Sequence, residues 1–237
     1  MSGALLAPTV SQAQSLNPPQ DLLLVLAVDS SGSVDPAEYR LQLDGLAAAF
    51  RDPEVQAAIT AGPNGRIAVN LLLWADARFE RFTTGWTVID GPEHAERFAR
   101  VIETFDKRVG GGTGIGAAIA QGIGLIETSG LSAPRRVIDV SGDGIEAHEG
   151  PPPPILLKEA RELLVTTDIV VNGLAIETDF PRLAGYYRKE VAHGPGSFVV
   201  SARTYEDFAA AIRDKLIREI EQKVVERPGV RRLAKAE

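Results

Sequence analysis

The chain has 237 residues, enough for one large α/β domain or two small ones, and its 44% hydrophobic and 24% charged residues are ordinary for a globular protein. A net charge of −7 argues against a nucleic-acid partner, and the lack of cysteine excludes disulfides, zinc–thiolate sites and cysteine nucleophiles. No apolar stretch approaches the roughly 18 residues of a transmembrane helix, so we expect no integral membrane segment.

The first 20 residues carry no charge, and the run at 4–7 followed by small residues at 11–13 is similar to the end of a secretory signal peptide. The basic start and most of the apolar segment of such a signal are missing, so a disordered leader fits equally well. We therefore expect a leader or signal remnant at 1–20, one domain at 21–224 and a charged tail at 225–237.

Beyond residue 20, short apolar runs that predict strands alternate with segments whose apolar residues recur at helical spacing. We expect strands at residues 21–28, 66–75, 79–82, 137–140, 169–176 and 197–201. We expect helices at residues 35–51, 91–108, 115–127, 155–165, 183–191 and 205–224. This alternation implies βαβ crossovers and predicts an α/β fold with a doubly wound, mostly parallel central sheet flanked by helices and one antiparallel edge strand.

Three predicted helices carry features that bear on packing. Gly122 and Gly124 suggest that the helix at 115–127 lies close to a strand. The pair Tyr186 and Tyr187 is expected to pack a helix onto the sheet. The final helix should cover the sheet through apolar residues spaced four apart, with charges in the gaps. These apolar residues are Phe208, Ile212, Leu216 and Ile220.

Oxygen-bearing side chains gather in three polar loops at strand ends or helix starts. Asp29, Ser31 and Ser33 follow the first strand at alternate positions, which can direct three oxygens toward one point. Thr113 lies in a glycine-rich loop, and Asp143 follows a later strand. Doubly wound sheets bind ligands beyond the carboxyl ends of their strands. A site with only oxygen donors suits Mg²⁺, Mn²⁺ or Ca²⁺, and two carboxylates leave the ion able to accept an outside carboxylate.

These residues, in this chain order, resemble the metal-ion-dependent adhesion site of von Willebrand factor A domains. The resemblance spans roughly residues 21–224 and implies a Rossmann-type three-layer fold. It also implies that Ser31 and Ser33 bind the metal directly and that Thr113 binds it directly or through water, depending on the ligand state. Asp29 and Asp143 would act mainly through water.

Segments in the second half of the chain are similar to a bacterial branch of A-like domains with no assigned function. The matching segments are residues 141–144, 171–174, 186–187 and 194–200. Members of that branch commonly carry a signal peptide, which implies a periplasmic or secreted protein, with the cytoplasm as the alternative. The acids and histidine at 145–149 depart from the small polar residues of the branch and add negative charge beside the site.

The resemblance implies a binding module without catalytic residues, in which one divalent cation coordinates an Asp or Glu of a partner protein. Mg²⁺ is the expected ion, with Mn²⁺ and Ca²⁺ as alternatives. A second hypothesis is a metal-dependent hydrolase of phosphate or ester substrates with His148 or Glu146 as base. A third is a degenerate A-domain that serves only as a scaffold. The glycine loop at 112–116 is similar to a nucleotide-binding loop, but an amphipathic helix precedes it instead of a buried strand, so we expect no nucleotide cofactor.

Overall fold

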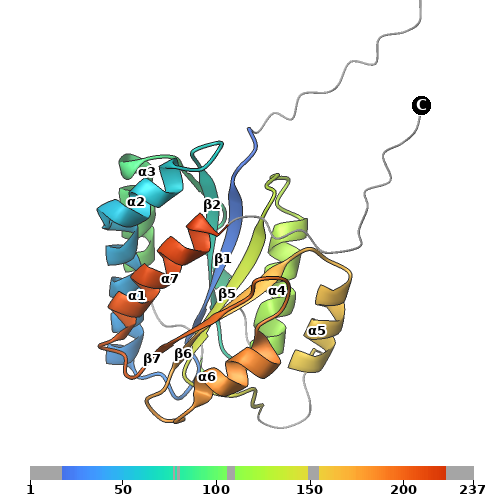
Figure 1. The fold of residues 1–237 in the computed structure, drawn as a ribbon. Coiled ribbons are helices and arrows are strands. Elements are labelled where there is room, and N and C mark those ends of the chain that lie inside the picture. Colours follow the sequence, from blue (N-terminus) through green and yellow to red (C-terminus); the bar gives the residue numbers. More distant parts are fainter. Residues whose placement is uncertain (1–17, 77, 79–80, 106–109, 149–154, 223–237) are drawn as a thin grey trace, which may run out of the picture.

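The central sheet holds five parallel strands, with two short antiparallel strands on one edge (Figure 1). The computed structural model describes residues 18–76, 78, 81–105, 110–148 and 155–222. The strands are β1 (Leu22–Asp29), β2 (Ile67–Trp74), β3 (Phe82–Thr83), β4 (Thr87–Ile89), β5 (Arg136–Gly142), β6 (Val170–Ile176) and β7 (Val199–Ala202). Their order is β3-β2-β1-β5-β6-β7, and β4 also pairs with β2. This confirms the predicted doubly wound, mostly parallel sheet, whose antiparallel edge consists of β3 and β4.

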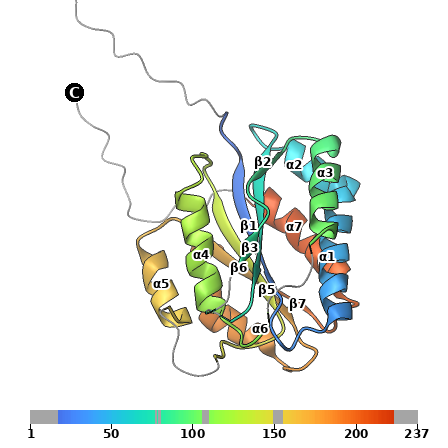
Figure 2. The same ribbon diagram turned by 180° about the vertical axis from the view of Figure 1, so that it is seen from behind.

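Helices cover both faces of the sheet, giving three layers (Figures 1 and 2). One face carries α1 (Pro36–Arg51), α2 (Pro53–Thr60), α3 (Pro92–Glu103) and α7 (Phe208–Glu221). The other carries α4 (Ile115–Glu127), α5 (Leu157–Val165) and α6 (Leu183–Tyr186), which continues as a π-helical segment, Tyr187–Val191. No helix of the described residues is long and apolar enough to cross a membrane.

The chain ends and several predicted boundaries fall on residues that the structure does not describe. Residues 1–17 and 223–237, which hold most of the expected leader and all of the expected tail, lie outside the described residues. The division at residues 20 and 224 therefore stays a prediction. The same holds for the first part of the predicted edge strand, at 79–80, and for the end of the predicted helix 91–108 beyond residue 105.

Helix α2 is an element that the hydrophobic pattern did not predict. It begins directly after α1, where Asp52 accepts hydrogen bonds from the backbone N–H groups of Glu54 (2.8 Å) and Val55 (3.3 Å). Asp52-Pro53 repeats the signature of Asp35-Pro36, an N-cap followed by proline in the first turn. The local start signal was thus present, but eight residues are too short for a clear period.

The inner strands are buried along their whole length because helices cover both of their faces. Along β1, Leu24 and Leu26 pack toward α1 and α7, whereas Leu23 and Val25 pack toward α4. This two-sided burial explains why the sequence shows a continuous apolar run here instead of an alternating one.

The two glycines of α4 differ in their surroundings. A β-carbon built on Gly122 would lie 2.8 Å from Cδ1 of Ile138 on β5, so this glycine allows the close packing that we predicted. A β-carbon on Gly124 would meet no atom within 4 Å, and the prediction is wrong for this residue. Two residues correspond to more than half a turn of a helix, which carries Gly124 to the far side.

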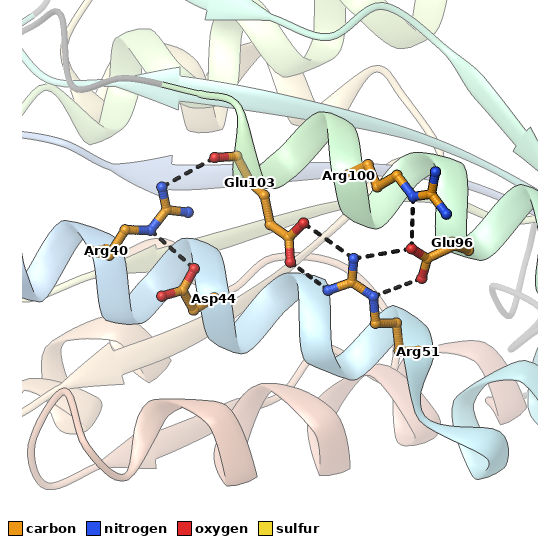
Figure 3. Close-up of polar contacts among 6 residues, drawn as sticks. All are labelled: Arg40, Asp44, Arg51, Glu96, Arg100 and Glu103. Atoms are coloured by element: carbon orange, nitrogen blue, oxygen red, sulfur yellow. Dashed lines mark hydrogen bonds and ion pairs between the residues drawn. The ribbon is translucent and has the colours of Figure 1, made fainter.

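Exposed ion pairs connect α1 to α3 along one side of the molecule (Figure 3). The guanidinium of Arg51 contacts the carboxylates of Glu96 (2.7 Å) and Glu103, and Arg100 donates a further hydrogen bond to Glu96 (2.8 Å). Hydrogen bonds from Arg51 and Arg100 lower the pKa of Glu96 to about 2. Because the pairs are exposed, we expect them to orient the two helices while adding little stability.

A buried ionic cluster connects α7 to the sheet. The ammonium of Lys215 lies 2.6 Å from Oδ2 of Asp139 on β5 and 2.8 Å from Oε2 of Glu219, and all three residues are at most 2% exposed. The Nδ2 of Asn172 on β6 donates to Oε1 of Glu219 (2.6 Å), while its Oδ1 accepts from the backbone N–H of Phe198 (2.8 Å). Two carboxylates thus share one ammonium, so the ionised cluster carries a net negative charge.

We expect the free energy of unfolding to rise by about 1 kcal/mol through Asp139 as the pH falls from 7 to 5. Burial raises the pKa of Asp139 from 3.8 to about 6, although Lys215 acts in the opposite sense. The folded protein therefore takes up a proton in this range, whereas the unfolded chain, with its lower pKa, does not. Urea unfolding at both pH values measures the rise, which Asp139→Asn should abolish.

Glu146 provides the control for this measurement, because burial raises its pKa as well. In wild type and in Glu146→Gln, the rise in the free energy of unfolding that comes from Asp139 should remain. If Asp139→Asn shows the same rise between pH 7 and 5 as wild type, the assignment to Asp139 is wrong.

Candidate metal-binding site

The five predicted site residues lie at the carboxyl ends of the neighbouring strands β1 and β5 and in the loop before α4. These strand ends point to the lower side of Figure 1, and the sheet reverses its strand order at this pair. Asp29 is the last residue of β1, Asp143 directly follows β5, and Thr113 precedes α4 by one residue. The position is the one where doubly wound sheets form ligand sites.

Backbone hydrogen bonds on both sides hold the loop between β1 and α1. Oδ1 of Asp29 accepts from the backbone N–H of Ser31 (2.7 Å), and the Gln42 side chain donates to the Asp29 carbonyl (3.1 Å). The N–H of Gly32 donates to the Gly111 carbonyl (2.9 Å), and a β-carbon on Gly32 would lie only 3.1 Å from that oxygen. Glycine therefore lets this loop approach the loop that carries Thr113.

A continuous series of oxygen contacts joins the two strand ends. The hydroxyl oxygens of Ser31 and Ser33 lie 3.1 Å apart, and Ser33 donates to Oδ1 of Asp143 at 2.9 Å. Oδ2 of Asp143 accepts from the hydroxyl of Tyr205, which precedes α7, at 3.0 Å. Asp29, Ser31 and Asp143 are buried, whereas Ser33 is exposed, so the series reaches the surface at Ser33.

Thr113 approaches the same corner from the third loop. Its backbone exchanges two hydrogen bonds with Ala147, at 2.7 and 2.9 Å, and the next residue, Gly114, donates to the Ala75 carbonyl. A β-carbon on Gly144 would lie 3.4 Å from the Thr113 hydroxyl oxygen. The threonine hydroxyl therefore lies beside the residue that follows Asp143, and all three loops meet.

The donor chemistry at this corner fits a hard divalent cation. Adjacent ligands of an octahedral Mg²⁺, each about 2.1 Å from the ion, lie about 3 Å apart. The 3.1 Å separation of the Ser31 and Ser33 hydroxyl oxygens is compatible with two such ligands, and Asp143 lies behind them, 2.9 Å from the Ser33 hydroxyl. Among the described residues, no three histidine, cysteine or acidic side chains gather as a metal site. Any metal bound here would therefore depend on serine and threonine hydroxyls.

The family is identified by a match over nearly the whole chain. The family model described as "Protein of unknown function (DUF1194)" matches residues 19–224. The chain belongs to this DUF1194 family. None of the curated proteins matches it in sequence.

Solved structures similar to this DUF1194 chain have von Willebrand factor A-type folds. The vWF domain of the type V pili tip protein Mfa5 from Porphyromonas gingivalis has 11% identity and a TM-score of 0.57, with 89% of this chain and 99% of that chain covered. The PilB minor pilin from Streptococcus sanguinis has 12% identity and a TM-score of 0.62, with 88% and 64% covered. Proximal thread matrix protein 1 from the mussel byssus, with a zinc-occupied MIDAS motif, has 16% identity and a TM-score of 0.56, with 86% and 48% covered. The chain thus spans less than two thirds of the pilin and about half of the mussel protein, and the likeness establishes the A-type fold.

Asp76 is a buried acid near the site of this DUF1194 chain that the sequence reasoning missed. Its carboxylate accepts from Nε (2.9 Å) and Nη2 (2.6 Å) of Arg78 and, at 3.3 Å, from the backbone N–H of Gly112. The hydrogen bonds from Arg78 hold the pKa of Asp76 well below its usual range. Asp76 therefore supports the loop of Thr113 while Arg78 balances its charge. Its place after the buried strand β2, like that of Asp29 after β1, was the available signal.

The acids beside the site have a structural explanation. The Glu146 carboxylate accepts from the backbone N–H of Gly116 (2.9 Å) in the first turn of α4, and the Glu146 N–H donates to the Tyr186 hydroxyl (3.1 Å). This places the carboxylate at the positive end of a helix, where an anion is favoured. His148 is exposed at the end of this loop.

Proposed function

We propose that this protein is a non-enzymatic binding module that holds one divalent cation between Ser31, Ser33 and Thr113, with Asp29 and Asp143 behind them. The cation coordinates an Asp or Glu side chain of a partner protein. Mg²⁺ is the expected ion, with Mn²⁺ and Ca²⁺ as alternatives. The observation that carries the proposal is the continuous series of oxygens from Ser31 through Ser33 to Asp143, two loops that are far apart in the chain.

Charge and exposure support the role of an outside carboxylate. Asp29 and Asp143 are buried beneath the hydroxyls, whereas Ser33 is exposed. Two carboxylates that act through water leave a divalent ion electrophilic, so an anionic ligand from solvent is favoured on the exposed side. Because the protein carries a net negative charge, the cation is the place where an anionic side chain would be attracted. The same net charge disfavours nucleic acid as a partner.

The named structural neighbours support the same class of function. They include pilus proteins and a mussel byssus protein with a zinc-occupied MIDAS motif. Pilus and byssus proteins act outside the cytoplasm. Together with the signal-like residues at 4–13, they support a periplasmic or secreted location, which belongs to the proposal.

Titration calorimetry of the full chain with MgCl₂, MnCl₂ and CaCl₂ tests the metal site. We expect wild type to bind one ion, and Asp29→Ala and Ser33→Ala to weaken binding at least tenfold, because Ser33→Ala removes a ligand oxygen and Asp29→Ala removes a carboxylate behind the ligands that also holds the Ser31 N–H. Asp44→Ala, an exposed acid on α1, provides the control and should bind as wild type does. No binding by wild type, or equal binding by Asp29→Ala, would refute the metal site.

Affinity capture from the native organism, with and without a chelator, tests the partner. The proposal expects a protein that is retained with Mg²⁺ and lost on chelation, and that Ser33→Ala does not capture. A partner retained equally under both conditions would show that binding does not use the metal.

A further inference from the structure

A buried phenol lies beneath the site and has no role in the proposal so far. Tyr187, in the π-helical segment after α6, is fully buried. A β-carbon on Gly173 of β6 would lie 2.8 Å from Cδ1 of its ring, so the glycine lets the ring pack directly on the sheet. Its hydroxyl has no hydrogen-bond partner among the described residues. A buried polar group without a partner destabilises the folded state, so the presence of this hydroxyl in the interior needs an explanation.

The hydroxyl of Tyr187 and the carboxylate of Asp29 both lie beside Gly142. A β-carbon built on Gly142 would lie 2.8 Å from the Tyr187 hydroxyl and also 2.8 Å from Oδ2 of Asp29. The two oxygens therefore face the same small space, which only a glycine at position 142 leaves open. The other site carboxylate, Asp143, already receives a hydrogen bond from the phenol of Tyr205. Each buried carboxylate of the site thus has a phenol beside it.

The phenol at this position is a neutral hydrogen-bond donor. Burial raises the pKa of Tyr187 well above its ordinary value, and the negative charges of Asp29 and Asp143 act in the same direction. Burial and these charges therefore favour the neutral, protonated phenol. A neutral donor favours the ionised form of a neighbouring carboxylate without adding a positive charge that would compete with a cation.

We propose that Tyr187 is a positioning residue of the metal site, whose hydroxyl donates to Asp29, or to water held by Asp29, when a cation is bound. The inference rests on the proposed metal site. It explains why an unbonded hydroxyl is kept in the interior, where phenylalanine would fill the same space. It also assigns each site carboxylate a phenol donor, Tyr187 for Asp29 and Tyr205 for Asp143.

The test uses Tyr187→Phe in the full chain, with two measurements that separate positioning from packing. By calorimetry, the affinity for Mg²⁺ should fall about tenfold or more, as for other groups that orient metal ligands. The melting temperature in chelator should stay unchanged or rise, because the lost hydroxyl had no partner within the protein. Tyr186→Phe is the matched control, since its hydroxyl accepts from the Glu146 N–H and should not affect Mg²⁺ affinity.

The outcomes distinguish this inference from the proposed function. If wild type binds Mg²⁺ and Tyr187→Phe binds it equally well, the role of Tyr187 is refuted and the metal site remains. If Tyr186→Phe weakens binding as much as Tyr187→Phe, the effect is not specific to the phenol near Asp29, and the inference is also refuted. If wild type binds none of the three cations, the metal site itself is refuted, and the role of Tyr187 with it.

Discussion

Replacing Lys215 by methionine should lower the free energy of unfolding by about 3–5 kcal/mol at pH 7. Methionine keeps the length and apolar stem of the side chain but removes the only ammonium within contact of Asp139 and Glu219 among the described residues. Burial alone would lower the pKa of Lys215, yet the two carboxylates outweigh burial and raise it, so the ammonium is charged in the folded state. Urea unfolding followed by circular dichroism gives the loss.

Two further variants define the cause of that loss. Arg213→Met, two residues before Lys215 and partly exposed on α7, removes ion pairs with Asp52 and Glu54 and should cost much less. Adding Glu219→Gln to Lys215→Met should recover part of the stability, because it removes one of the two unpaired charges. A Lys215→Met variant as stable as Arg213→Met would show that the buried cluster does not contribute as its geometry indicates.

The cluster also marks a limit of prediction from sequence. The spacing of Phe208, Ile212 and Leu216 predicted correctly that α7 packs on the sheet side of the molecule. The same pattern assigned only gap positions to the intervening charges, and of these Lys215 and Glu219 are buried. Periodicity identifies a face from its apolar residues alone. It cannot show that a charge at the edge of that face meets Asp139 on a strand distant in sequence.

The positions of the predicted site residues could be predicted from the sequence because they depend on where individual strands end. In a parallel sheet, the ends of neighbouring strands lie together, so strand prediction was enough to bring Asp29 and Asp143 to one edge. The side chains that lie behind the site could not be predicted in this way. Tyr187 was expected only to pack a helix, which it does on Gly173, while the direction of its hydroxyl depends on Gly142 in another strand. Such contacts require the relative placement of elements that no single segment encodes.

Gly116→Ala should lower the free energy of unfolding by more than about 2 kcal/mol and should weaken Mg²⁺ binding relative to wild type in the same buffer. A β-carbon on Gly116 would lie 2.2 Å from the carbonyl carbon of Leu156 and 2.3 Å from the nitrogen of Leu157. These are backbone atoms at the start of α5, so no side-chain rotation can relieve the contact and α4 must move away. Only Gly114 separates Thr113 from the first turn of α4, which couples this movement to the proposed site. Melting temperature and calorimetry measure the two effects.

Gly124→Ala provides a control with the same substitution in the same helix. A β-carbon there meets no atom within 4 Å, and alanine favours a helix over glycine by up to about 1 kcal/mol, so this variant should be slightly more stable than wild type. If the free energy of unfolding falls for Gly116→Ala and rises for Gly124→Ala, the contact between α4 and α5 determines the result, and not a general preference for glycine in this helix. Equal effects at both positions would contradict the packing of α4 against α5, and with it the mechanical link from that contact to Thr113.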